Sequence, residues 1–166
     1  MATLNSSLHP IEPHRMRAAM AKVPTSVAVV AGDPDGRAAI VVGSFVSVSL
    51  EPSLAGFFVD RSSTSWPKLR AAEILGISVL SSRQHFMCDK IVRKHEDRFD
   101  EVHWTHGPLG SPLLPGAVAH IECRVEQVSS AGDHELVLVR VVGLSEGEIA
   151  DPLVFHDRGY AGLAAR

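Results

Sequence analysis

The 166-residue sequence has few cysteines and no long apolar run. Its two cysteines, Cys88 and Cys123, form no C-x-x-C pair or metal motif, so we expect free thiols. No segment approaches the ~20 apolar residues that a membrane-spanning helix requires. Residues 1–12 lack the apolar stretch of a secretory signal peptide and are expected to form a flexible N-terminal arm. These absences predict a cytoplasmic chain that does not enter a membrane.

An excess of positive charge is also lacking, since 16 Lys and Arg face 19 Asp and Glu, for a net charge of −3. Nucleic-acid-binding domains carry a basic face, so no nucleic-acid partner is expected. The sequence has no Gly-x-Gly-x-x-Gly, P-loop or Gly-x-Ser-x-Gly motif, which excludes the Rossmann, P-loop and serine-hydrolase patterns. His103 and His106 lie three residues apart, as do His85 and Cys88, but neither pair belongs to a dense ligand cluster, and no metal is expected.

The length predicts one domain, residues 13–166. Short β-branched runs separated by turn residues indicate strands. The continuous apolar runs Val27–Val30 and Leu136–Val139 predict burial on both faces of their strands. The Asp33–Gly36 and Ala131–His134 segments have the composition of turns. The expected strands are Ser26–Ala31, Arg37–Val42, Leu54–Val59, Leu75–Leu80, Ala117–Ser129, Glu135–Leu144 and Leu153–Phe155.

Three short helices are expected between the strands. In His14–Lys22, helical spacing places Met16, Ala19, Met20 and Val23 on one buried stripe. Thr64 or Ser65 is a candidate cap for a helix that runs through Pro67 toward Glu73, and Gln84–Lys94 is the third helix. Phe99–Pro115 is irregular and long enough to suggest a functional segment or a cover.

Strands therefore dominate, and most are joined by hairpins. This pattern predicts a mainly β fold, an antiparallel β-barrel with a few packed helices. A doubly wound parallel sheet is not expected, because strands and helices do not alternate over most of the chain.

Small hydroxylated residues surround the expected strand Leu54–Val59. Ser62, Ser63 and Thr64 follow this strand and precede a helix, where hydroxyls and free N–H groups can collect a phosphate, with Arg61 as a cation. The same pattern also fits a well-capped helix after a polar loop. Upstream, Gly43–Ser49 offers backbone groups to a planar ring, or forms an edge strand with a polar outer face.

A histidine beside a carboxylate lies in the second expected turn. Asp133 and His134 at the mouth of a hairpin can meet a second substrate or help a proton step. The alternative is a surface turn in which the aspartate bonds its own backbone.

These runs together resemble the flavin reductase family over nearly the whole chain, from Arg15 to Leu163. The resemblance rests on the order and spacing of several short motifs. They are Pro24-Thr25-Ser26-Val27, Ser44–Pro52 (Ser-Phe-x-Ser-Val-Ser-Leu-x-Pro), Ser62–Trp66 (Ser-Ser-Thr-x-Trp), Gly110–Leu114, Glu122-Cys123, Gly132–His134 and Pro152–Phe155.

The resemblance implies a split β-barrel, Greek-key-like, that binds FMN or FAD, usually at a homodimer interface. Such enzymes use NADH or NADPH to reduce flavin, by hydride transfer to its N5, and release it to a partner monooxygenase. The resemblance also implies which residues form the site. The flavin ring would be lined by Thr25, Ser26, Val27, Val41, Val42, Gly43, Ser44, Ser47 and Val48, and the phosphate held by Asp60, Arg61, Ser62, Ser63 and Thr64. His134 would lie near the nicotinamide as the catalytic residue.

Two departures from the family pattern bear on flavin binding. Ser26 replaces the usual glycine, and Val41-Val42-Gly43 replaces a Thr-x-Ser-type stretch, so a hydroxyl near the ring is lost. Two other functions remain open. One is a flavin-dependent oxidase or monooxygenase with its own organic substrate, and the other is a non-enzymatic carrier of flavin or haem on the same barrel.

Overall fold

The structure is a computed structural model that describes residues 10–33, 37–93, 99 and 102–163. Its main feature is an antiparallel sheet of seven strands in the order β3-β2-β6-β9-β10-β5-β4. The strands are β2 (Ala28–Gly32), β3 (Ala38–Val42), β4 (Val46–Ser49), β5 (Leu54–Asp60), β6 (Leu75–Val79), β9 (Ala119–Ala131) and β10 (His134–Glu146). The predicted mainly β, antiparallel split-barrel fold is confirmed.

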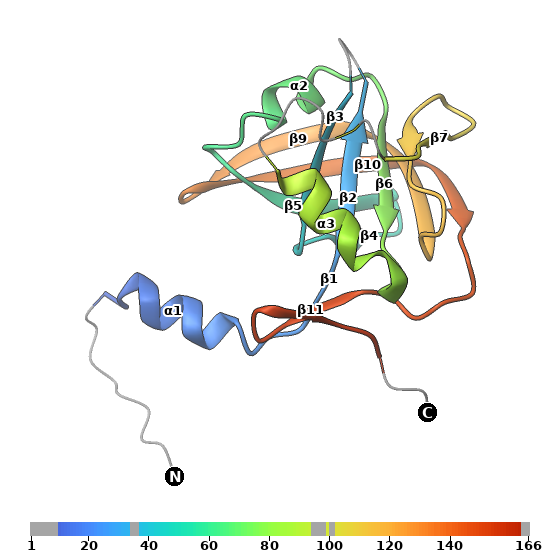
Figure 1. The fold of residues 1–166 in the computed structure, drawn as a ribbon. Coiled ribbons are helices and arrows are strands. Elements are labelled where there is room, and N and C mark those ends of the chain that lie inside the picture. The colour runs from blue at the N-terminus through green and yellow to red at the C-terminus, as the bar shows by residue number, and fades with distance from the viewer. Residues whose placement is uncertain (1–9, 34–36, 94–98, 100–101, 164–166) are drawn as a thin grey trace.

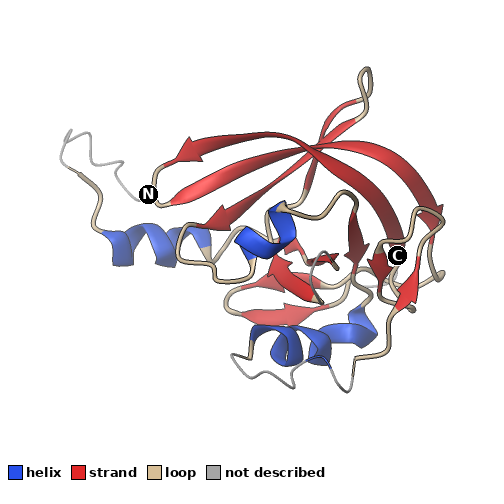
Figure 2. Ribbon diagram, turned by 90° about the horizontal axis from the view of Figure 1, so that it is seen from above, coloured by secondary structure: helices blue, strands red, loops and turns tan. Residues whose placement is uncertain are grey.

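The smaller elements lie around this sheet. β1 (Thr25–Ser26), β11 (Val154–His156) and β12 (Gly159–Ala161) form a three-stranded sheet, and β7 (Thr105–His106) pairs with β8 (Pro112–Leu113). The helices are α1 (Pro13–Met20), α2 (Trp66–Arg70), α3 (His85–Val92) and the short 3-10 helix η1 (Ser82–Gln84). Figure 2 shows the long strands as one curved layer, with α1 standing off to one side.

The β9–β10 hairpin is the longest feature of the sheet. Its two strands have 13 residues each, and they meet at a tight turn where Gly132 has φ +67°. Glycine accepts this conformation without a steric cost. The turn pairs His134 with Ala131 on one side and with Asp60 of β5 on the other. The hairpin turn predicted from the sequence is therefore confirmed, and it brings His134 beside the end of β5.

The core has two apolar clusters separated by β2. Alternate residues of β2 point to opposite faces, so Ala28 and Val30 belong to one cluster and Val29 and Ala31 to the other. The first cluster contains Phe57 and Val137 under α2, and the second lies under α3. All five residues of β2 are buried, which confirms the predicted burial on both faces.

The prediction of a buried stripe on the first helix was wrong. Met16, Met20 and Val23 are each about half exposed, and α1 has no buried residue. The helix points away from the sheet (Figure 1) and is attached at its C-terminal end, where Lys22 pairs with Asp157 at 2.7 Å. Helical spacing identifies an apolar face, but it does not say whether this chain covers that face. Of the expected N-terminal arm, residues 1–9 lie outside the described residues.

The predicted burial of Leu136–Val139 on both faces was also wrong. Val137 and Val139 are fully buried, whereas Leu136 and Leu138 are only partly covered. Phe58 lies opposite Leu136 on β5 and is exposed. The described residues therefore leave this outer face of β5 and β10 partly open.

The helix after β5 starts and ends differently from the prediction. Ser65 occupies the N-cap position, but neither it nor Thr64 makes a side-chain cap bond; instead Ser63 Oγ accepts the Trp66 N–H at 3.3 Å. The helix ends at Arg70, three residues before Glu73. With only five residues, α2 offers little helix dipole to an anion, which weakens one argument for a phosphate at this point.

A buried carboxyl group holds the segment that the sequence marked as irregular. Glu122 on β9 is buried and accepts hydrogen bonds from Leu109 N–H at 3.0 Å and from the Ser111 hydroxyl at 2.8 Å. Gly107 lies against the same group, since a Cβ there would be 2.4 Å from Glu122 Oε1. Residues 107–111 are thereby anchored to the sheet, and they carry no side chain toward the predicted site.

Both cysteines are free, as predicted, and the structure shows that both are buried. Burial raises the pKa of the Cys123 thiol to about 12. The described residues hold no group of three or more His, Cys, Asp or Glu that is placed to bind a metal ion. None of the described helices has both the length and the apolar character needed to span a membrane.

Candidate functional site

A hollow of about 370 Å³ opens where β3 ends beside β5. These strands are not hydrogen-bonded neighbours in the sheet, but the sheet curves so that they come into contact. We call this space the first hollow. It is lined by Ile40, Val41, Val42, Gly43, Ser44, Phe58, Val59, Asp60, Ser63 and His134. Its volume lies in the lower part of the range of about 300–1,000 Å³ that is usual for small-molecule sites.

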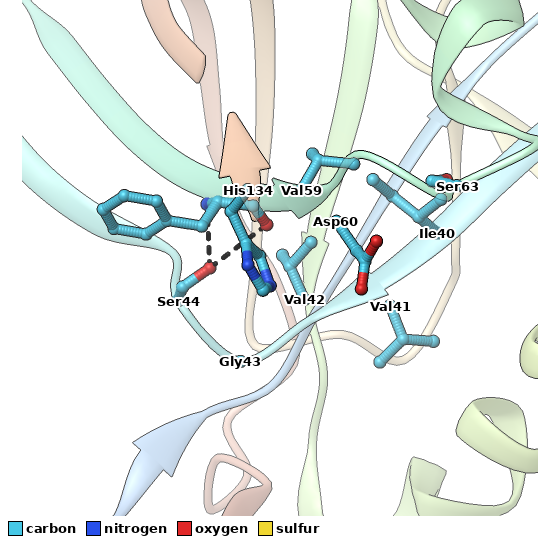
Figure 3. A pocket seen from close by; sticks show the side chains of 10 residues that line it. Ile40, Val41, Val42, Gly43, Ser44, Val59, Asp60, Ser63 and His134 are labelled. Atoms are coloured by element: carbon cyan, nitrogen blue, oxygen red, sulfur yellow. Dashed lines mark hydrogen bonds between the residues drawn. The ribbon is translucent and has the colours of Figure 1, made fainter. Parts of the chain in front are cut away.

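One side chain ties the two walls of the first hollow together. Ser44 Oγ accepts the Phe58 N–H at 2.9 Å and lies 3.5 Å from the Phe58 carbonyl oxygen. These contacts link the end of β3 to the outer edge of β5 (Figure 3). Gly43 makes the bend before Ser44, and a Cβ there would lie 3.1 Å from Thr25 Oγ1. The chain thus turns closely around the rim of the hollow.

The polar end of the hollow carries negative charge. Asp60 Oδ1 accepts the Ser62 N–H at 2.7 Å, and hydrogen bonds from Ser62 lower the pKa of the Asp60 carboxyl below its ordinary value. Asp60 is therefore ionised at neutral pH. His134 Nδ1 lies 2.7 Å from Asp133 Oδ1, and this hydrogen bond lowers the pKa of Asp133. Asp133 thus orients the imidazole of His134, which is one of the side chains that line the hollow (Figure 3).

The structure brings about half of the predicted site residues together. Those in the first hollow are Val41, Val42, Gly43, Ser44, Asp60, Ser63 and His134. Their convergence comes from the pairing of His134 with Asp60 and from the contact of β3 with β5. The hollow therefore combines an apolar wall, hydroxyl groups and one imidazole.

The other predicted residues do not line it. Thr25 and Ser26 form β1 near the rim, where the Ser26 hydroxyl donates to the Phe45 carbonyl at 3.5 Å. Val27 is buried in the second core cluster, and its N–H and C=O are bonded to Leu153 and Leu80. Ser47 and Val48 lie along β4, while Arg61, Ser62 and Thr64 are exposed in the loop after β5.

Ile40, Phe58 and Val59 line the hollow but were not singled out from the sequence. Strand alternation contains part of this information, because Phe58 shares a face with Asp60, two residues along, and Ile40 shares one with Val42. What the sequence does not give is the approach of β3 to β5, which places both strands on one cavity.

Comparison with known proteins gives one consistent family. Residues 20–164 match the model of the flavin reductase like domain. A flavin reductase of Pseudomonas putida is 43% identical over 157 residues, which cover 93% of this chain and 92% of that protein. HsaB, the reductase subunit of a flavin-dependent monooxygenase from Rhodococcus jostii, is 36% identical, with 92% and 79% covered.

The fold agrees with these sequence matches. A crystal structure of a Streptomyces globisporus NADH:FAD oxidoreductase in complex with NAD and FAD fragments superposes with a TM-score of 0.86. The two chains are 28% identical, and the alignment covers 94% of this chain and 97% of that one. This chain belongs to the flavin reductase like domain family.

Proposed function

We propose that this protein is an NAD(P)H-dependent flavin reductase that supplies reduced flavin to a partner monooxygenase. The observation that carries the proposal is the first hollow, in which an apolar wall, hydroxyl groups and His134 meet at one end of the sheet. Relatives that match along nearly the whole chain are named flavin reductases and reductase subunits of monooxygenases. Bound flavin supplies the redox chemistry by accepting a hydride from the nicotinamide, while the chain orients both.

The first hollow suits the ring of a flavin better than its phosphate. Val42, Phe58 and Ile40 give the apolar contact that a flat ring system requires. Ser63, with Ser62 and Thr64 beside it, offers hydroxyl groups to a phosphate, and Arg61 adds a positive charge. The ionised Asp60 repels a phosphate, so its role is to hold the loop through Ser62 rather than to bind the anion.

The assignment of the reaction is tested by turnover. The protein is mixed with NADH or NADPH and with FMN or FAD, and the loss of nicotinamide absorbance is followed. We expect oxidation that requires added flavin and exceeds the protein-free rate. Gel filtration of the mixture separates this function from an oxidase, because a reductase that hands on its flavin releases it. Absence of turnover with every pair would reject the proposal.

We expect His134 to act on the nicotinamide side of the ring. Replacing His134 with Ala removes the imidazole that Asp133 orients, so kcat/KM for the nicotinamide should fall at least about tenfold through lost positioning. The dissociation constant for flavin, from fluorescence quenching, should change less than about threefold, since the apolar wall is intact. Asp133→Asn, which keeps the ring, should have a smaller effect. An unchanged kcat/KM in His134→Ala would remove His134 from the site.

We also propose that two copies of the chain associate through the outer face of β4, β5 and β10. Alternation and register place Val46, Val48, Leu54, Phe58, Leu136 and Leu138 on this face. Val46 and Val48 are about half exposed, and an uncovered apolar strip of this kind is typical of an interaction surface. His134 and Asp60 lie on the same face, at its end, so a second copy would border the first hollow.

The double variant Val46→Asp/Val48→Asp tests this surface. Two charges buried in an interface oppose association, so sedimentation equilibrium should show a dimer for the wild type and a monomer for the variant. The control is Val92→Asp, which places a charge at an equally exposed position on α3 and should remain dimeric. A wild type that is monomeric at micromolar concentration would contradict the proposal.

The proposed activity also implies a partner and a compartment. A reductase that releases its product needs an oxygenase to consume reduced flavin, and we infer a transient partner of that class. A nicotinamide co-substrate and two free buried thiols support a location in the reducing cytoplasm.

A further inference from the structure

A second hollow, of about 450 Å³, adjoins the first and has the opposite electrostatic character. It lies between α2 and the β9–β10 hairpin and is lined by Arg61, Ser63, Trp66, Pro67, Arg70 and Glu135. Ser63 lines both hollows. The first hollow carries the Asp60 carboxylate, whereas the second has two guanidinium groups against one carboxylate. The positive charge therefore lies in the second hollow, which shares Ser63 with the first, next to the hydroxyl groups that were predicted to hold a phosphate.

Three side chains of the second hollow, those of Trp66, Glu135 and Arg61, are held by hydrogen bonds. The buried Trp66 donates its Nε1–H to Glu135 Oε2 at 2.7 Å, which ties α2 to β10 and engages the carboxylate. The Arg61 guanidinium bonds the Ser130 hydroxyl at the end of β9. Leu69, which is fully buried, fixes the turn of α2 that carries Arg70.

Arg70 is the group without an assigned role. It is exposed, and it makes no ion pair with any described residue. Arginine is well suited to phosphate, because its planar guanidinium can donate two parallel hydrogen bonds. An arginine that lines a hollow next to the proposed flavin site, and that makes no ion pair with a described residue, is placed to bind a further phosphate.

We propose that the second hollow is a subsite for the nucleotide half of FAD, with Arg70 binding the phosphate that FMN lacks. The proposal rests on the proposed function, since the flavin ring and its first phosphate must lie in and beside the first hollow. Ser63 borders both spaces, so the first phosphate at Ser63 places the second at the mouth of the cationic hollow. Its volume leaves room for part of the adenosine beside Trp66 and Pro67. The site thereby favours the dinucleotide over the mononucleotide.

The test compares FMN and FAD binding in Arg70→Gln. Dissociation constants are measured by quenching of flavin fluorescence on the full chain, and circular dichroism confirms folding. We expect wild type to bind FAD at least about tenfold more tightly than FMN, because FAD gains one charge-assisted contact with Arg70. Arg70→Gln should lose this preference and bind FMN within about twofold of wild type. Lys68→Gln removes the same charge from the same helix outside the hollow and should behave as wild type.

The results separate the two claims. If neither flavin binds to wild type, the proposed function and the subsite both fail. If FMN and FAD bind equally well to wild type, or if Arg70→Gln retains the preference for FAD, the subsite alone is overturned. An Arg70→Gln variant that raises the KM for NADPH, leaves that for NADH unchanged and keeps its FAD affinity would assign Arg70 to the nicotinamide phosphate and also overturn the proposal.

Discussion

Replacing Ser63 with Glu should weaken binding of both flavins by about 100-fold. Ser63 lines both hollows and stands beside the ionised Asp60. A second carboxylate there would face the flavin phosphate, and two unit charges roughly 5 Å apart at an effective dielectric constant of about 20 repel by about 3 kcal/mol. Screening by salt reduces this, and a 100-fold change corresponds to about 2.7 kcal/mol.

The matched control is Ser63→Gln, which has nearly the shape of glutamate without its charge. Both variants lose the bond between the Ser63 hydroxyl and the Trp66 N–H, so the loss of that bond affects them equally. Titration of FMN and FAD at low and high salt should show a large, salt-dependent loss of flavin affinity in Ser63→Glu. The loss in Ser63→Gln should be small and independent of salt. Equal defects would mean that bulk rather than charge matters at this position, and the phosphate would have to lie elsewhere.

Replacing Glu122 with Ala should lower the free energy of unfolding by about 3 kcal/mol. The carboxyl group accepts from the N–H groups of Leu109 and Ser111 and from the Ser111 hydroxyl. Removing it leaves buried donors without a partner and opens a cavity between β9 and residues 107–111. For a chain of this length, such a loss corresponds to a fall in Tm of roughly 6–12 °C.

Glu126, four residues along the same strand, provides the comparison. Its carboxylate pairs with Arg140 at 2.7 Å, but both side chains are more than a third exposed. An exposed ion pair contributes about 0–1 kcal/mol, so Glu126→Ala should unfold close to wild type in urea. If Glu122→Ala were as stable as Glu126→Ala, residues 107–111 would not depend on the buried carboxyl group.

Much of the fold could be predicted because the strands have clear local signals. The run Val27–Val30 is apolar throughout and is buried on both faces, and the composition of residues 131–134 identified the hairpin turn. What the sequence did not predict correctly is which apolar residues are covered by the rest of the chain. The apolar stripe of α1 and the outward residues Leu136 and Leu138 have the composition of buried positions, yet the described residues leave that stripe about half exposed and the two leucines only partly covered. Their hydrophobicity is consistent with cover supplied by a second copy.

The site was predictable as motifs but not as a cavity. The serine-rich loop and His134 stood out because hydroxyl and imidazole groups suggest chemistry. They meet only because Asp60 and His134 are paired in the register of β5 and β10, and the 73 residues between them in the sequence do not reveal this pairing. The role of Arg70 was hidden for the same reason, since it is an ordinary exposed arginine until α2 packs beside Glu135.

The most direct test of the account is a crystal structure of the protein with FAD bound. We predict that the isoalloxazine ring lies against Val42 and Phe58 in the first hollow, with the first phosphate within hydrogen-bonding distance of the Ser63 hydroxyl. A ring bound at any other surface, with the space between β3 and β5 filled only by water, would contradict it.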